Sequence, residues 1–190
     1  SRFAEDPSFN TMFEDEIRIA TTLSHPNIGQ VLDVGRVAAN YYLAMEFIHG
    51  QDLRAILGRC LERGHPVPLS MAAAIGAKIC SALDHAHQAC SLEGRPLNVV
   101  HRDVSPSNIM VSYDGQVKLI DFGIARAANR SSLTMPGTIK GKLRYLSPEQ
   151  VLGFSLDGRS DLFTLATSLW EATMGRCLFD AEHEAQIYQA

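Results

Sequence analysis

Apolar residues recur at helical spacing in three long segments of the chain. The first stripe follows Asp6-Pro7, a typical helix start, and ends at "SHPN". It consists of Met12, Ile19, Ala20 and Leu23. The second segment, residues 70–88, is apolar nearly all round, as expected of a buried helix, and the third, residues 160–174, is strongly apolar. The pattern therefore predicts three helices.

Two strands and a short helix lie between the first two helices. "GQVLDVGRV" and "NYYLAMEFI" are typical of strands, and "HGQDLRAILGRCLERG" indicates a short helix after a loop. The order is one helix, then strands, then mostly helices. This order predicts an α+β architecture with a helical main lobe.

A hairpin between residues 108 and 121 carries candidate metal ligands. "NIMVSY" and "QVKLID" are strand-like runs separated by Asp114-Gly115, a strong signal for a two-residue turn. That turn places Asn108 opposite Asp121, with Cβ atoms about 5 Å apart. A carboxylate and an amide oxygen suit Mg²⁺, which takes its remaining ligands from phosphates and water. Asp103, just before the hairpin, is expected beside the same point and could orient an attacking hydroxyl.

Several ordered motifs in this region resemble those of protein kinases. "HRDVSPSN" resembles the catalytic loop, "DFG" follows it at the expected distance, and "SPE" stands where kinases have Ala-Pro-Glu. "LAMEFIHG" resembles the hinge, and "SDLFTLATSLWEATMGR" resembles the helix that anchors the large lobe. The chain is similar to the eukaryotic-like (Hanks-type) serine/threonine kinases of bacteria. The resemblance implies part of a small lobe in residues 1–47 and most of the helical catalytic lobe in residues 48–190.

The resemblance also implies a function and assigns roles to individual residues. The activity would be transfer of the γ-phosphate of ATP to Ser and Thr hydroxyls of proteins in signal transduction, with ATP and Mg²⁺ as cofactors. Asp103 matches the catalytic base, Asn108 and Asp121 match the Mg²⁺ ligands, and Arg102 matches the group that receives an activation-loop phosphate. The implied nucleotide contacts are Met45 as gatekeeper, the backbone of Glu46 and Ile48 to adenine, Asp52 to ribose, and Met110 beneath the base. Ala20, Val31, His101 and Phe122 match the stacked internal spine, and Asp161 matches the buried aspartate that ties it to the helical lobe.

Glu16 matches the helix glutamate that pairs with the ATP-binding lysine. The sequence supports this role independently, because a carboxylate on an apolar stripe needs a cation to meet it. However, no Lys occurs before Lys78, and no Gly-rich loop precedes Asp6. Truncation upstream is the simplest account, and such a fragment is expected to be poorly active or inactive alone. The alternative is a pseudokinase that binds nucleotide or a partner without transferring phosphate.

Two positions depart from the usual kinase pattern. Ser105 occupies the place of a catalytic-loop Lys, and Lys142 occupies the place of the Thr that this Lys normally contacts. One hypothesis is that Lys142 reaches back beside Asp103 and replaces the missing charge; the alternative is a solvated or substrate-facing loop residue. Among the nearby hydroxyls, Thr138 matches the phosphate-acceptor position best, and autophosphorylation there would let it pair with Arg102. A solvated Thr is the alternative.

Composition excludes several other classes of protein. The formal net charge of −4 over 190 residues gives no basic footprint for nucleic acid. The four cysteines are widely spaced, which argues against a metal or disulfide role. No apolar stretch is long enough to span a bilayer, so we expect a cytoplasmic segment that does not contact membrane. The resemblance implies that its partners are protein substrates with Ser or Thr. A small-molecule phosphotransferase is a further alternative, but the segment ending in "YLSPE", which docks peptide in protein kinases, argues against it.

Overall fold

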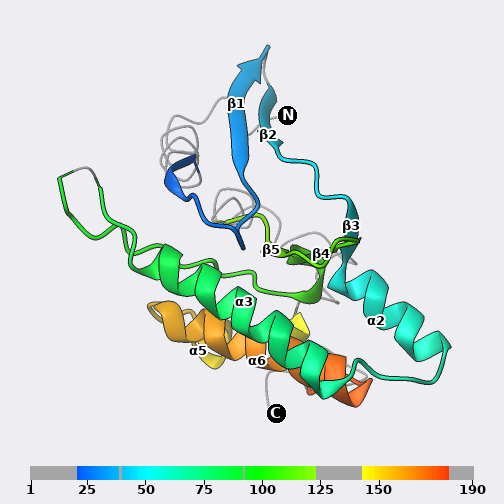
Figure 1. Ribbon diagram of the computed structural model, residues 1–190. Coiled ribbons are helices and arrows are strands. Elements are labelled where there is room, and N and C mark those ends of the chain that lie inside the picture. Colours follow the sequence, from blue (N-terminus) through cyan, green and yellow to red (C-terminus); the bar gives the residue numbers. More distant parts are fainter. Residues whose placement is uncertain (1–20, 39, 92, 123–142, 180–190) are drawn as a thin grey trace.

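The computed structural model describes residues 21–38, 40–91, 93–122 and 143–179. Figure 1 shows a two-stranded sheet above a mainly helical body, with a small three-stranded sheet where they join. This confirms the predicted α+β architecture. Of the first predicted helix, only the end lies within the described residues, where Thr21 and Thr22 are helical and Leu23 is buried; Glu16 lies outside them.

The two-stranded sheet consists of β1 (Val31–Val37) and β2 (Asn40–Met45). The strands run antiparallel, with Val34 opposite Leu43 and a register irregularity near the start of β1. Both strands were predicted, although each is shorter than the apolar pattern indicated. After β2, the backbone N–H of Glu46 donates to the carbonyl of Gln30 (2.9 Å), which fixes the start of the following segment against β1.

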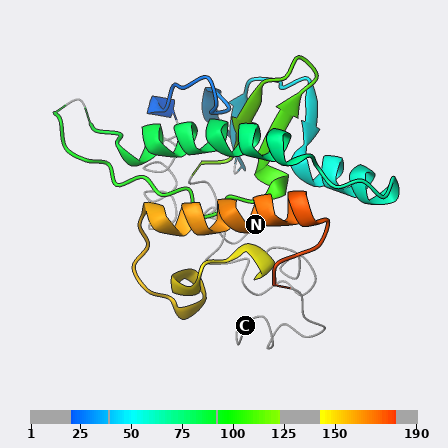
Figure 2. The same ribbon diagram turned by 60° about the horizontal axis from the view of Figure 1, so that its bottom comes forward.

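Two long helices form the body, α3 (Leu69–His87) and α6 (Gly158–Met174). They lie side by side in Figure 2, and a glycine lets them approach closely: a Cβ on Gly76 would lie 2.8 Å from Leu169 Cδ1. The buried residues of α3 occupy one face, at helical spacing. They are Ala72, Ile75, Gly76, Ile79, Ala82, Leu83 and Ala86. Leu69 and Met71 are exposed, so among the described residues α3 is buried on one side, not all round.

The three-stranded sheet has the order β3 (Gly50–Asp52), β4 (Ile109–Ser112) and β5 (Val117–Leu119). Its β4–β5 register differs from the predicted one, because Ile109 pairs with Leu119 and Val111 pairs with Val117. Asn108 therefore lies opposite Ile120, and the N–H of Ile120 donates to the carbonyl of Asn108 (2.9 Å). Asp121, the predicted partner of Asn108, is one residue further along the chain.

The physical reason for the corrected register is a three-residue loop. The side-chain oxygen of Ser112 accepts from the backbone N–H of Gln116 (2.8 Å) and donates to Asp114. Gly115 takes a left-handed conformation with φ of 86°. These local bonds stabilise a loop over residues 113–115 in place of the two-residue turn that Asp-Gly favours.

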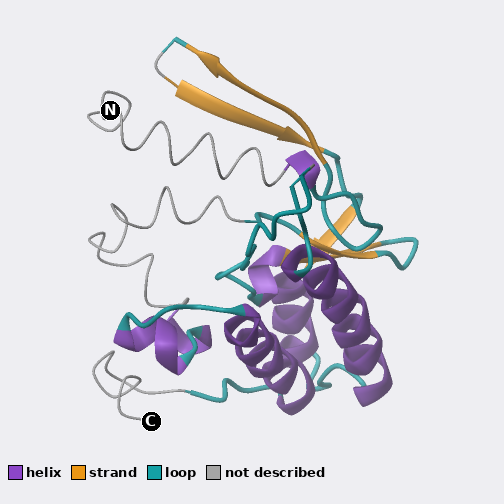
Figure 3. Cartoon of the chain, turned by 90° about the vertical axis from the view of Figure 1, so that its left-hand side faces the viewer, coloured by secondary structure: helices purple, strands orange, loops and turns teal. Residues whose placement is uncertain are grey.

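Shorter helices place the remaining loops around this core. They are α2 (Leu53–Glu62), α5 (Pro148–Leu152) and the 3-10 turns η1 (Pro106–Asn108) and η2 (Leu143–Tyr145). Figure 3 shows the strands on one side of the molecule and the helices on the other. Within the described ranges, none of the helices combines the length and apolar character needed to cross a lipid bilayer.

Candidate active site

The loop between α3 and β4 is anchored to α6 by one buried carboxylate. Asp161 is fully buried, and it accepts hydrogen bonds from the backbone N–H groups of His101 (2.8 Å) and Arg102 (2.7 Å). His87, at the end of α3, approaches the same carboxylate through Nε2 (2.8 Å). A buried carboxylate is stable only when hydrogen bonds replace its water. Asp161 therefore joins α3, α6 and the loop at a single point.

His101 connects this anchor to the segment after β5. Its Nδ1 accepts from the N–H of Asp103 (3.2 Å), so the proton is on Nε2, which donates to the carbonyl of Ile120 (2.9 Å). The imidazole is thus the neutral Nε2–H tautomer. Its ring meets Phe122 edge to face, with centroids 4.6 Å apart. The contact predicted between His101 and Phe122 is present, whereas Ala20 lies outside the described residues.

Asp103 and Asn108 are bonded to each other. The amide nitrogen of Asn108 donates to the backbone carbonyl of Asp103 (2.7 Å) and to its carboxylate (3.0 Å). Asn108 is buried, and within the described residues its amide oxygen accepts no hydrogen bond. The amide is therefore oriented by its donor side, and its oxygen is left for another ligand. Such an oxygen is a hard ligand that suits Mg²⁺.

Two non-glycine residues near this pair have left-handed backbone conformations. Arg102 has φ of 70°, and Asp121 has φ of 64°. Each such conformation costs about 1–3 kcal/mol and persists only when the surroundings impose it. At Arg102 the surroundings are visible, since its N–H binds Asp161 and its carbonyl accepts from the side chain of Gln150 on α5 (2.7 Å). Strain of this kind concentrates at functional sites.

Ser105 is buried within the same loop. Its side chain is 3% exposed, and its hydroxyl has no hydrogen-bond partner among the described residues. A buried hydroxyl without a partner costs about 1–3 kcal/mol, so this position calls for a further polar group. Lys142 and Thr138 both lie outside the described residues.

The predicted nucleotide contacts lie along the segment from β2 to β3 and on β4. Met45 ends β2, and Asp52 pairs with Met110 across β3 and β4, which brings the predicted ribose and base contacts together. Asp52 also caps α2, since its Oδ1 accepts from the N–H of Ala55 (2.8 Å). One carboxylate oxygen is thus committed to the helix.

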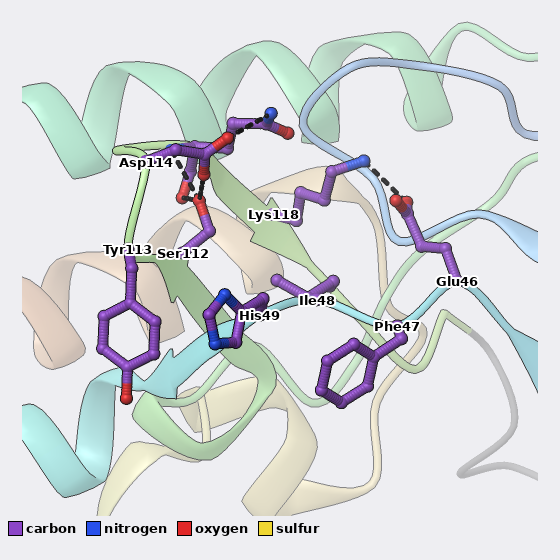
Figure 4. A pocket seen from close by; sticks show the side chains of 9 residues that line it. Glu46, Phe47, Ile48, His49, Ser112, Tyr113, Asp114 and Lys118 are labelled. Carbon is purple, nitrogen blue, oxygen red and sulfur yellow. Dashed lines mark hydrogen bonds and ion pairs between the residues drawn. The ribbon is translucent and has the colours of Figure 1, made fainter.

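A cavity of about 520 Å³ opens beside this segment. Figure 4 shows Glu46 and Lys118 pointing toward each other (2.6 Å), with Phe47, His49 and Tyr113 along its other side. The cavity includes Glu46 and Ile48 but not the other predicted nucleotide contacts, Met45, Asp52 and Met110.

The ion pair controls the ionisation of Glu46. Burial raises the pKa of its carboxyl group, but hydrogen bonds from Lys118 and the backbone of Gln30, together with the Lys118 charge, outweigh burial and lower it. The Glu46 carboxylate is therefore bound by Lys118 and Gln30, and the backbone N–H of Glu46 is used by the carbonyl of Gln30.

Sequence reasoning missed three residues that shape the site. His87 and Gln150 hold the loop through Asp161 and Arg102, and Arg54 on α2 donates from Nε to the side chain of Ser107 (3.2 Å). Only His87 carried a signal, as an imidazole in the last turn of a helix that precedes the motif. The other two depend on contacts between distant segments, which no local pattern reports.

Comparison with known proteins shows which family the chain belongs to. The chain matches the protein kinase domain family over residues 3–190, and it therefore belongs to that family. Its relatives are bacterial kinases of the Hanks type. Tyrosine-protein kinase MasK of Myxococcus xanthus is 41% identical over 185 residues, which are 97% of this chain and 29% of that protein.

Other relatives carry serine/threonine kinase names. PknB of Mycobacterium leprae is 40% identical over 97% of this chain and 28% of its own length, and PrkC of Bacillus subtilis is 35% identical over 97% and 27%. The chain thus spans less than a third of these relatives. Among solved structures, the PknI kinase domain of Mycobacterium tuberculosis matches with a TM-score of 0.71 and 29% identity, over 94% of this chain and 62% of that one.

Proposed function

We propose that the protein containing this chain transfers the γ-phosphate of ATP to hydroxyl groups of proteins in the cytoplasm. The observation that carries this proposal is the bonded pair of Asp103 and Asn108, held by the Asp161 anchor. Asp121 directly follows Ile120, whose N–H donates to the backbone carbonyl of Asn108. The family membership of the chain and the kinase names of its relatives support the same activity.

In this proposal Asp103 is the catalytic base. Its carboxylate accepts the proton of the substrate hydroxyl while the new oxygen–phosphorus bond forms and the bond to the bridging oxygen of ADP breaks. The N–H group of Asn108 keeps that carboxylate in place. The amide oxygen of Asn108 and the carboxylate of Asp121 would hold Mg²⁺, which would neutralise the phosphate charge.

The hinge contacts can be refined from the backbone bonds. The N–H of Glu46 is used by the carbonyl of Gln30, so only the carbonyl of Glu46 is left to accept from the adenine amino group. The N–H of Ile48 would donate to the adjacent ring nitrogen. Met110 would lie beneath the base and Asp52 beside the ribose, in line with their pairing across β3 and β4.

We further propose that Lys142 replaces the charge missing at Ser105. The support is the exchanged residue types in the sequence and the buried hydroxyl of Ser105, which has no partner among the described residues and which an ammonium group would satisfy. Lys142→Thr should lower kcat/KM about 100-fold, while Lys140→Thr, the matched control, should change it little. Adding Ser105→Lys to Lys142→Thr should restore activity; a double variant no better than the single one would refute the exchange.

The substrate hydroxyl has two candidates. Relatives named as serine/threonine kinases favour Ser and Thr, whereas the relative named as a tyrosine kinase favours Tyr. We propose Ser and Thr as the acceptors. Phosphoamino-acid analysis of the reaction products separates the two, because phosphotyrosine alone would exclude the serine/threonine assignment.

Intact-mass analysis of the full-length protein with Mg²⁺ and ATP tests the activity. We expect added phosphates that vanish in Asp121→Ala and in Asp103→Asn but persist in Asp84→Ala, an exposed control on α3. Mapping would show whether Thr138 is an acceptor that pairs with Arg102. ATP binding without transfer to the protein or to any generic substrate would instead establish the pseudokinase.

A further inference from the structure

Arg54 occupies an unusual place at the start of α2. It is the second residue of that helix, whose first turn contains no acidic residue. A cation there meets the positive end of the helix dipole, which costs about 0.3–1 kcal/mol. Arg54 is exposed, and it forms no ion pair with any of the described residues. The stability of α2 therefore does not account for an arginine at this position.

The contacts of Arg54 place it against the catalytic loop. Its Nε donates to the hydroxyl of Ser107 (3.2 Å), and Ser107 directly precedes Asn108. In the described part of the chain, its two terminal nitrogens make no hydrogen bond. One side of the guanidinium is thus fixed by the loop, and Arg54 as a whole is exposed in the described part of the chain.

Arg54 also lies near the segment that precedes α5. Burial and Glu171 raise the pKa of the Tyr145 hydroxyl, and the charge of Arg54 acts in the opposite direction. Tyr145 begins the "YLSPE" sequence, where protein kinases dock peptide. The guanidinium therefore contacts the loop through Ser107, and its charge acts on Tyr145 in the expected peptide-docking segment.

We infer that Arg54 is a specificity-determining residue that binds an anionic group of the protein substrate, close to the hydroxyl being phosphorylated. This inference rests on the proposed kinase function. The planar guanidinium presents paired donors that match a carboxylate or a phosphate, and both could come from the substrate, as an acidic residue or as a previously phosphorylated one. Ser107 orients the guanidinium without neutralising it.

The test uses the full-length protein and a set of peptides with one acceptor hydroxyl on a neutral background. Asp, phosphoserine or Arg is placed in turn at each flanking position, and kcat/KM is measured together with the KM for ATP. At one position, Asp should raise kcat/KM about two- to fivefold through the peptide KM, as expected for an exposed ion pair. Phosphoserine should raise it further because it carries nearly two charges.

Arg54→Glu should reverse the preference at that position toward Arg, with the KM for ATP unchanged. Arg59→Glu, an exposed arginine in the last turn of the same helix, is the matched control and should keep the wild-type preference. Active Arg54→Glu enzyme with an unchanged preference would refute the inference alone. So would a raised KM for ATP without a change in peptide preference, since the anion would then belong to the nucleotide. Absence of transfer to every peptide by wild-type protein would refute the proposed function itself.

Discussion

Replacing Asp161 tests the anchor on which the site geometry depends. The carboxylate is fully buried and accepts from two backbone N–H groups and from His87, at 2.7 to 2.8 Å. In Asp161→Ala these donors lose their acceptor, and each unsatisfied buried group costs about 1–3 kcal/mol. Breaking a buried charged cluster typically costs about 3–5 kcal/mol in total, and we expect a loss in that range. This is a large part of the 5–15 kcal/mol that stabilises a typical domain.

Asp161→Asn refines the same test. The amide oxygen can still accept a backbone N–H, but its NH₂ group faces a donor, so a loss of about 1–3 kcal/mol is expected. The control is Asp157→Asn, at the exposed N-cap of the same helix, which should lower the unfolding free energy much less than Asp161→Ala does. The assay is urea unfolding of the kinase domain followed by circular dichroism. A loss in Asp161→Ala no larger than in Asp157→Asn would refute the anchoring role.

Four further substitutions have expected outcomes. Gly50→Ala would place a Cβ 2.2 Å from a carbonyl oxygen of β4, so it should destabilise the fold by about 1–3 kcal/mol. Gly58→Ala, whose Cβ would meet nothing within 4 Å, should instead stabilise α2 by up to about 1 kcal/mol. Equal shifts of the melting temperature in the two variants would contradict this reasoning. Lys118→Met should lower the unfolding free energy by up to about 1 kcal/mol at pH 7. Because the pKa of Glu46 is lowered and the ion pair is lost when its carboxylate protonates, this difference from wild type should disappear only below pH 4.5. A difference that acid does not change would exclude the ion pair as its source. Ser147→Ala, which removes the capping box of α5, should lower the unfolding free energy by about 1 kcal/mol, measured by thermal melting.

The long helices were predictable because their apolar spacing is a local property. The helix predicted over residues 70–88 is found at Leu69–His87, and the one over 160–174 is found at Gly158–Met174. The register of the hairpin was not predictable in this way, because Asp114-Gly115 favours a two-residue turn whereas the Ser112 side chain stabilises a three-residue loop. A single extra loop residue changes the residue opposite Asn108 from the predicted Asp121 to Ile120.

The candidate site was predictable only in its motif residues. Asp103 and Asn108 are close in sequence, and their spacing alone suggested that they act together. The supports of the loop come from other parts of the chain: His87 reaches Asp161 across 74 positions, and Arg54 reaches Ser107 across 53. Such contacts depend on how the helices pack, which the hydrophobic pattern of a single segment does not specify.

The distance along the chain between the loop and its anchor also sets an order of events during synthesis. Asp161 is 60 residues beyond His101, so a growing polypeptide completes the catalytic loop well before the anchor is made. Until α6 has formed and docked, the N–H of Arg102 lacks its bond to Asp161, which is part of what imposes the left-handed conformation there. Because domains fold as their segments emerge from the ribosome, we expect the loop to reach its working shape late. A nascent chain that stops before Asp161 would present every motif residue of the loop and still lack the bonds that fix its backbone in the folded protein.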